Sequence, residues 1–262
     1  MRNDFYWGIA SYNRKDKQPF LTLLNAMGYP RERIILAVQC ERDYADYKAR
    51  YDGMATILFR EGENVCDNKN TILEYLVERC GNPSVVMMSD KVRGIQYLTR
   101  DNQLKTIDTK DEMDGFIHKA FAVTKLAGAR VFGCYPVSNK FFMSHTMQYN
   151  LQMLGCFMGI VDPSEQPFNR RYPLKEDFEY ILRHVARGNK TLRFNDVCLL
   201  ATYHSKGGSY ELWHADGDKV NEECTNRLLR EYGNLVRRHP TRKNEIRYVG
   251  ARATINKSIF DI

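Results

Sequence analysis

The chain has 262 residues and a formal net charge of +7 at pH 7, and 43% of its residues are hydrophobic and 27% charged. These proportions are ordinary for a globular protein and exclude a chain that is disordered throughout, and no apolar run reaches membrane-spanning length. The positive charge favours polyanionic partners, although solvated basic faces produce the same composition.

The first half of the chain alternates apolar strand patterns with helical patterns. Strands are predicted at 4–12, 33–40, 55–61 and 84–90, and helices at 19–28, 42–53 and 68–83. The N-terminal segment turns polar too early for a signal peptide and is expected to open with the first strand. Strands that alternate with helices predict a parallel sheet covered by helices on both faces.

The second half is less regular. Helices are predicted at 113–129, 175–190 and 220–236, strands at 130–138 and within 142–162, and a pair of strands or one long strand at 191–204. The helix at 175–190 opens with acidic and ends with basic residues, which its dipole favours. No repeat or Pro/Ser-rich linker separates the halves, so one domain is expected over 1–262, with halves of about 1–100 and 101–262.

Polar residues follow three of the predicted strands. They are Ser11, Tyr12, Asn13 and Arg14 after the first strand, Arg60 and residues 61–64 after the third, and Ser89, Asp90 and Lys91 after the fourth. Ligands of parallel sheets bind beyond the carboxyl ends of the strands. A charged-ligand site is therefore predicted at this edge, although loops are polar in most proteins.

The sequence lacks the motifs typical of phosphate-binding loops, dinucleotide binding, serine hydrolases and histidine metal sites. The chain has no P-loop, no G-x-G-x-x-G, no G-x-S-x-G, and no H-E-x-x-H or H-x-H spacing among its six histidines. The seven cysteines form no C-x-x-C pair, which argues against a zinc ribbon and a disulfide scaffold. An odd number of scattered cysteines suits a reducing compartment, so a cytoplasmic protein is expected, with no membrane partner.

Four segments resemble the nucleotide-sugar glycosyltransferases of the GT-A fold. They are residues 9–15, 63–76, 85–92 and 173–197. The resemblance implies an α/β, Rossmann-like fold with a mixed, mainly parallel sheet, helices on its flanks and a less regular acceptor half. It also implies a nucleotide-diphosphate sugar as donor, such as a UDP-sugar, bound by the first half of the chain.

A closer likeness, spanning residues 5–210, is to the TET-associated glycosyltransferases. It is carried by residues 133–162, 175–197 and 206–211, in this order and spacing. That family occurs mainly in phages and is associated with the glycosylation of hydroxymethylated pyrimidines in DNA. The likeness implies a DNA acceptor and, for a phage protein, a location in the host cytoplasm.

The resemblance implies a D-x-D motif for Mg²⁺ or Mn²⁺ at residues 89–91, where this chain has Ser89-Asp90-Lys91. Asp90 alone can still hold the metal together with waters and phosphate oxygens, or Lys91 can supply the positive charge itself. A degenerate, inactive enzyme is a third interpretation, and a solvated polar pair at a strand end is a fourth. We expect retained activity with weakened or absent metal dependence.

Glu176 and Asp177 match the acidic pair that the resemblance places beneath the sugar. An inverting transfer needs a base that takes the proton from the acceptor hydroxyl, and Asp177 is the candidate, with Glu176 beside it. Acidic residues at a helix start also stabilise the helix dipole without any catalysis. The sequence leaves inversion or retention of configuration open.

Other side chains have possible binding roles. Tyr12 is expected to stack on the nucleobase and Arg14 to pair with the diphosphate. Candidates for ribose or sugar hydroxyls, or alternatively for helix caps, are Asn64, Lys69 and Asn70. Candidates for the acceptor side are Asn139, Arg193 and Lys206.

Contact with DNA is expected from the basic C-terminal part, at Arg227, Arg230, Arg237, Arg238, Arg242 and Lys243. Phe141 and Phe142 can fill the space of an extruded base, but core positions are expected for them. Two other functions stay open: a glycosyltransferase with a carbohydrate, lipid or protein acceptor, and a degenerate transferase that only binds nucleic acid.

Overall fold

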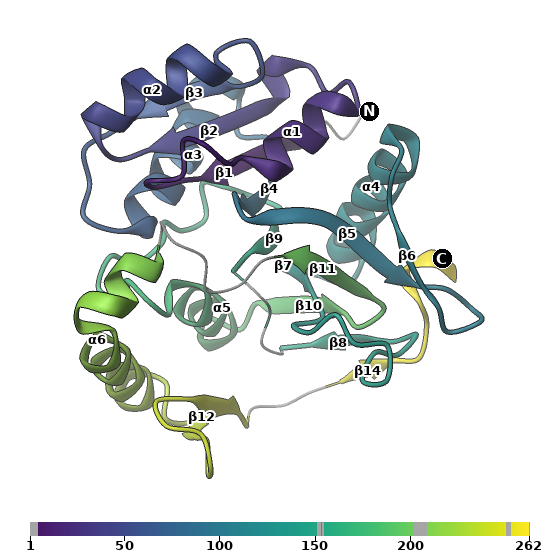
Figure 1. The fold of residues 1–262 in the computed structure, drawn as a ribbon. Coiled ribbons are helices and arrows are strands. Elements are labelled where there is room, and N and C mark those ends of the chain that lie inside the picture. Colours follow the sequence, from purple (N-terminus) through teal and green to yellow (C-terminus); the bar gives the residue numbers. More distant parts are fainter. Residues whose placement is uncertain (1–4, 151–152, 154, 202–208, 250–252, 262) are drawn as a thin grey trace.

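A nine-stranded sheet runs through the protein (Figure 1). The computed structural model describes residues 5–150, 153, 155–201, 209–249 and 253–261. In spatial order the strands are β14 (Thr254–Ile255), β8 (Met147–Tyr149), β10 (Lys190–Phe194), β7 (Ala129–Cys134), β9 (Phe157–Ile160), β4 (Ser84–Ser89), β1 (Phe5–Ala10), β2 (Ile34–Val38) and β3 (Thr56–Phe59).

Most of the strands point in one direction. β3, β2, β1 and β4 pair in parallel, as do β7 and β10, whereas β8 and β9 run antiparallel to both of their neighbours. The insertion of β9 between β4 and β7 makes the sheet mixed and mainly parallel, as predicted. The carboxyl ends of β1, β4, β7 and β10 therefore meet at one edge.

Helices cover both faces of the sheet. One face packs against α1 (Pro19–Ala26), α2 (Glu41–Tyr51) and α4 (Lys110–Leu126) through a core that contains Trp7 and Phe121. The other face packs against α3 (Val65–Cys80), α5 (Glu176–Ala186) and α6 (Ser209–Glu231). Short 3-10 helices, η1 (Arg31–Arg33) and η2 (Ile259–Asp261), complete the layers.

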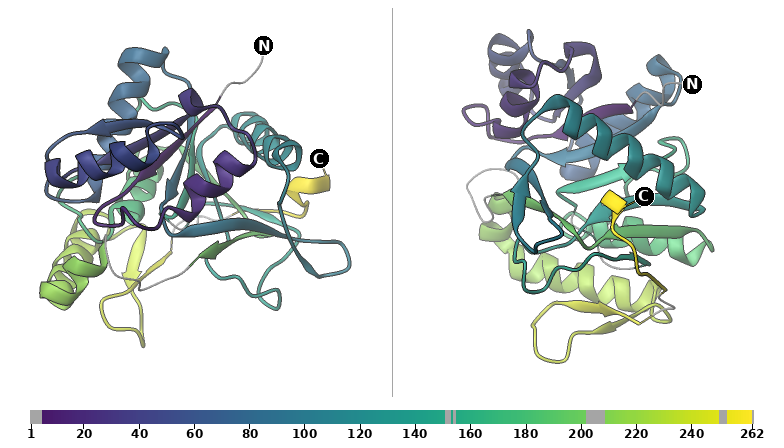
Figure 2. Two further views of the ribbon diagram at one scale, coloured as in Figure 1. Left: turned by 45° about the horizontal axis from the view of Figure 1, so that its top comes forward. Right: turned by 90° about the vertical axis from the view of Figure 1, so that its right-hand side faces the viewer.

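Two smaller sheets flank the large one (Figure 2). β5 (Val92–Leu98) continues from the turn after β4 and pairs with β6 (Leu104–Thr106) and β11 (Val197–Ala201). β12 (Val236–Arg238) and β13 (Ile246–Tyr248) form a hairpin that packs against α5. Neither sheet was predicted, because short strands with few partners leave little periodicity to read.

Helix ends follow their local sequence signals. Gly28, Gly81 and Gly188 take positive φ just after α1, α3 and α5, the left-handed conformation in which many helices end. α3 begins earlier than predicted, because Asn64 and Asp67 form a reciprocal capping box ahead of it.

Of the two alternatives predicted for 191–204, the pair of strands is confirmed: β10 and β11 are separate strands in different sheets. Residues 202–204 of that prediction lie outside the described residues. No helix within the described ranges is both long and apolar enough to cross a membrane.

Candidate active site

A buried polar cluster closes the carboxyl ends of β1 and β4. The two strands end in register at Ala10 and Ser89, so the residues that follow them are neighbours. The Ser11 hydroxyl donates to Asp90 Oδ2 at 2.6 Å, and Arg14 Nη1 donates to Asp90 Oδ1 at 3.1 Å. Because the side chains of Arg14 and Asp90 are nearly buried, this ion pair fixes the guanidinium at the strand end.

Three side chains that sequence reasoning missed support this cluster. The Tyr47 hydroxyl lies 2.7 Å from Ser11 Oγ and accepts from the Arg14 amide at 3.0 Å. Gln18 donates to Ser11 Oγ at 2.8 Å, and Asn68 donates to the Ser11 carbonyl at 2.9 Å. The loop after β1 is thus held by helices α1, α2 and α3 together.

Opposing influences act on the pKa of Asp90. Burial raises it above the ordinary range, while Arg14, the Ser11 hydroxyl and the charge of Lys91 favour the ionised form. Lys91 lies half-buried in the turn between β4 and β5. Two cationic side chains, Arg14 and Lys91, therefore act on the Asp90 carboxylate at this strand end.

Asp177 lies at the first turn of α5. Its Oδ2 accepts from the Gly155 amide at 2.9 Å and its Oδ1 from the Phe178 amide at 2.8 Å. A Cβ at Gly155 would lie 2.8 Å from Asp177 Cβ, so glycine permits this approach. Burial, followed by the charge of Glu176, raises the pKa of Asp177 to about 6, against the attraction of Lys69.

Glu176 forms a buried ion pair with a lysine of α3. Lys69 Nζ donates to Glu176 Oε1 at 2.9 Å and lies 4.7 Å from the centre of the Phe168 ring. Burial alone would lower the pKa of Lys69, but Glu176 and Asp177 outweigh it and raise the pKa, so the lysine stays charged. This ion pair joins the acidic pair to the first half of the chain.

Cys156 lies between the two clusters. Its carbonyl accepts from the Ser89 amide at 3.0 Å, which places it beside the end of β4. Burial raises the pKa of its thiol, and the charges of Lys91, Asp177 and Lys69 also act on it. The amide of the preceding residue, Gly155, binds Asp177, so residues 155 and 156 join residues 89–91 to residues 176–177 at the carboxyl edge of the sheet.

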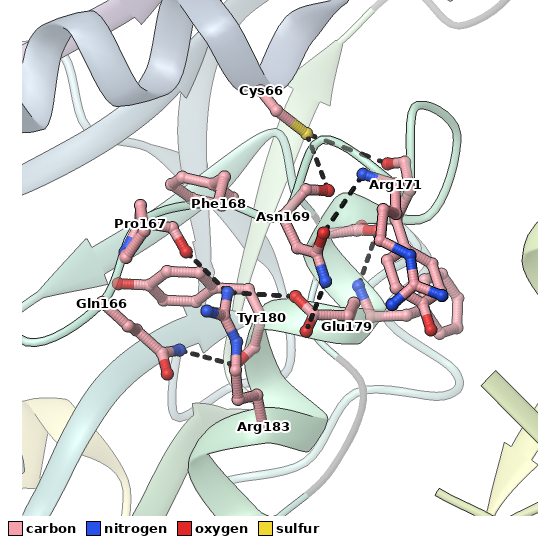
Figure 3. Close-up of polar contacts among 12 residues, drawn as sticks. Cys66, Gln166, Pro167, Phe168, Asn169, Arg171, Glu179, Tyr180 and Arg183 are labelled. Carbon is pink, nitrogen blue, oxygen red and sulfur yellow. Dashed lines mark hydrogen bonds and ion pairs between the residues drawn. The ribbon is translucent and has the colours of Figure 1, made fainter. Parts of the chain in front are cut away.

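A network of polar contacts fixes α5 beneath this edge (Figure 3). Glu179 pairs with Arg183 at 3.1 Å, and Arg183 donates to the Pro167 carbonyl at 2.5 Å. The Phe168 ring stacks on Tyr180 with centroids 4.3 Å apart. Because these contacts hold the helix on both sides, the position of Asp177 is set by the fold and not by a free loop.

Some predicted donor residues have structural partners. Asn64 caps α3 through the Cys66 amide, and Asn70 holds the Phe168 backbone by bonds to its carbonyl and amide. Arg60 follows the edge strand β3 and pairs with Glu74 in a shallow hollow that also includes Tyr44. Donor binding by these three residues stays a prediction, and Arg60 is separated from β1 by β2.

Tyr12 and Asn13 follow β1 at the cluster itself. Tyr12 is half-buried, and Asn13 takes φ 51° and its amide donates to Asp43 at 3.3 Å.

On the acceptor side, Arg193 at the end of β10 donates to Asn195 Oδ1 at 2.8 Å and lies over the Tyr135 ring at 5.1 Å. Asn139 lies in the loop after β7. Lys206 lies outside the described residues.

The prediction that Phe141 and Phe142 lie in the core is wrong. Their side chains are 84% and 67% exposed. Their apolar character predicted burial, but the turn in which Phe141 and Phe142 lie directs both side chains toward solvent.

The donor set at the strand end does not fit Mg²⁺ or Mn²⁺. Within the described part of the chain, no three His, Cys, Asp or Glu side chains gather as a metal site requires. Both oxygens of Asp90 already accept hydrogen bonds, from Ser11 and Arg14. Cationic side chains at positions 14 and 91 replace the further carboxylates that such ions prefer.

The profile of the TET-associated glycosyltransferases matches residues 9–208, and the chain belongs to this family. No curated protein matches it. A solved structure that it resembles is the mannose-1-phosphate geranyltransferase of Thermus thermophilus, at 13% identity and a TM-score of 0.34. The match covers 87% of this chain but only 64% of that one, less than two thirds of its length.

Proposed function

We propose that this glycosyltransferase moves a sugar from a nucleotide-diphosphate sugar to a hydroxymethylated pyrimidine in DNA. The observation that carries the proposal is the meeting, at the adjacent residues Gly155 and Cys156, of the cationic strand end at Arg14 and Lys91 with the half-buried carboxylate of Asp177. A leaving diphosphate needs positive charge, and an acceptor hydroxyl needs a base. One site supplies both requirements.

In this proposal the first half of the chain binds the donor. Tyr12 stacks on the nucleobase, and Arg14, held by Asp90, pairs with the diphosphate. Lys91 neutralises the charge that develops on the leaving group, in place of a divalent cation. Asp90 then serves as the anchor of Arg14 and Ser11, and the transfer proceeds without a metal.

Asp177 acts as the general base. In its ionised form it takes the proton of the acceptor hydroxyl as the oxygen attacks the anomeric carbon and the bond to the diphosphate breaks. The Gly155 and Phe178 amides hold its two oxygens. A pKa near 6 keeps it ionised at neutral pH and basic enough to accept a proton.

The exposed positive charge of the β12–β13 hairpin supports the proposal that the acceptor is a polyanion. Arg237 and Arg247 are exposed and directly opposite each other in the ladder, an arrangement of like charges that costs stability. On the inner side, Tyr248 of the same hairpin stacks on Phe178, the residue after Asp177. The hairpin thus packs beside Asp177 through its inner face and presents positive charge on its outer face, where DNA phosphates would compensate the repulsion.

Replacing Arg237 and Arg247 together by Gln is expected to weaken duplex binding and to reduce the slope of log K against log salt by about 2. Thermal stability should stay equal or rise, because the facing like charges are removed. Fluorescence anisotropy over a salt series measures the slope. The control is R79A/K125A, which removes two exposed cations from helix ends at the opposite edge of the sheet; an equal effect of both pairs would exclude the hairpin as the DNA surface.

The function is tested by incubating the protein with plain and hydroxymethylated DNA and a panel of nucleotide sugars, followed by nucleoside mass spectrometry. The proposal predicts a mass increase of one sugar residue on the hydroxymethylated base only. If every DNA keeps its mass while glycans, lipids or proteins gain a sugar, the proposal of DNA as the acceptor is wrong. Tight DNA binding with no sugar transfer would indicate a degenerate enzyme.

A further inference from the structure

Two phenylalanines project from the turn that follows β7. Phe141 and Phe142 are 84% and 67% exposed, and Val137 beside them is 53% exposed. Full exposure of an aromatic ring forfeits a large part of the burial free energy that the ring provides in a core. Two adjacent exposed rings therefore call for an explanation other than stability.

The turn is held in shape by the residues around the rings. Asn139 Oδ1 accepts from the Phe141 amide at 3.1 Å, and its carbonyl accepts from the Phe142 amide at 3.0 Å. On either side of Asn139, the side chain of Ser138 donates to Gln96 and that of Lys140 donates to Gln103, each at 3.0 Å. The rings are thus presented by a hydrogen-bonded turn that is fastened to β5 and to the loop before β6.

This turn starts from the same edge of the sheet as the active site. β7 points the same way as β4 and pairs with β9, whose first residues lie beside the end of β4. β7 also pairs with β10, and Arg193 of β10 lies over the ring of Tyr135, the residue that follows β7. The aromatic turn therefore rises from the acceptor side of the site, next to Tyr135 and Arg193.

We infer that Phe141 and Phe142 form a wedge that stacks against the bases of duplex DNA and holds the target nucleotide out of the helix. This inference rests on the proposed function. A base inside a duplex cannot bring its hydroxymethyl group to a half-buried carboxylate, so it must be extruded. Proteins that unstack DNA insert apolar side chains between base steps, and aromatic rings stack on any base.

The chemistry around the rings favours nucleic acid over another protein surface. The exposed rings stand on a narrow turn with the polar Ser138, Asn139 and Lys140, and not on a broad apolar face. The chain as a whole carries a net charge of +7, and the lysine within the turn adds positive charge where phosphates would approach.

The test compares wild type with F141A/F142A on hydroxymethylated duplex and on the same strand without its complement. We expect transfer to the duplex to fall about tenfold or more and transfer to the single strand to change less than about twofold, because only the duplex must be unstacked. A duplex with 2-aminopurine beside the target reports unstacking on binding, independent of transfer. Its fluorescence should rise with wild type and not with the variant.

Leu126→Ala is the matched control, since Leu126 is 87% exposed at the end of α4, on the opposite edge of the sheet. The inference is overturned if F141A/F142A and wild type give equal duplex transfer and equal fluorescence. It is also overturned if the variant loses transfer to both substrates alike together with melting temperature, which indicates a structural role. If wild type transfers to no DNA, the proposed function fails, while the fluorescence signal still decides whether the wedge unstacks DNA.

Discussion

Asp177→Asn is expected to lower kcat about tenfold or more, because asparagine keeps one oxygen, for one of the two amides that bind Asp177, but cannot accept a proton. In wild type, log kcat/KM should rise with pH and level off above about 6, where the carboxyl of the free enzyme becomes ionised. Rate measurements at saturating and at limiting acceptor over a pH range of about 4.5 to 8 give kcat and kcat/KM and check both statements. The variant should lose this step in its profile.

The stability of the same variant separates catalysis from helix capping. The pKa of Asp177 is raised from 3.8 to about 6 in the folded protein, so the folded state holds this proton more tightly than the unfolded state. Stability therefore falls as pH rises from about 4 through 6, and the ionised carboxylate costs stability at pH 7. At pH 7 Asp177→Asn removes this cost but also one of the two amide hydrogen bonds, so its melting temperature should stay close to that of wild type. Unchanged kcat with a lower melting temperature would reassign Asp177 to capping.

Lys91→Ala is expected to weaken nucleotide-sugar binding about 10- to 100-fold, the loss typical of a desolvated charge pair of roughly 1.5–3 kcal/mol. Chelator should leave wild-type activity unchanged, because the cations at the strand end take the place of a metal. Calorimetric titration with the nucleotide sugar and with the free nucleoside diphosphate measures the affinity.

The control for Lys91 is Lys105→Ala, which removes an exposed lysine of β6 that pairs with Glu112. A loss of affinity in both variants would indicate a general charge effect. Unchanged donor affinity in Lys91→Ala, or activity that disappears with chelator and returns with Mg²⁺ or Mn²⁺, would contradict the metal-free account.

The part of the site built from strand ends was predictable from sequence. Ser11, Arg14 and Asp90 each follow an apolar run, and parallel strands bring their carboxyl ends to one edge. The acidic pair at 176–177 was found through its family resemblance and its place at a helix start. The structure adds the hydrogen-bond partners of Asp177, because the backbone amides of Gly155 and Phe178 fix the position of its carboxylate.

Contacts between distant segments could not be read from the sequence. Tyr47 and Gln18 look like ordinary helix residues, and only the packing of α1 and α2 on the sheet brings them to Ser11. Lys69 was expected to meet sugar hydroxyls, and its ion pair with Glu176 joins residues 107 positions apart. The exposure of Phe141 was not predicted, because apolar residues in a short loop do not show whether the turn directs their side chains toward the core or toward solvent.

The most direct test of the central claim is a crystal structure with a non-hydrolysable nucleotide sugar. The account predicts the diphosphate within hydrogen-bonding distance of Arg14 and Lys91, the nucleobase on Tyr12, and the anomeric carbon facing Asp177. A donor bound elsewhere, or a metal ion held by Asp90 between the protein and the phosphates, would contradict it.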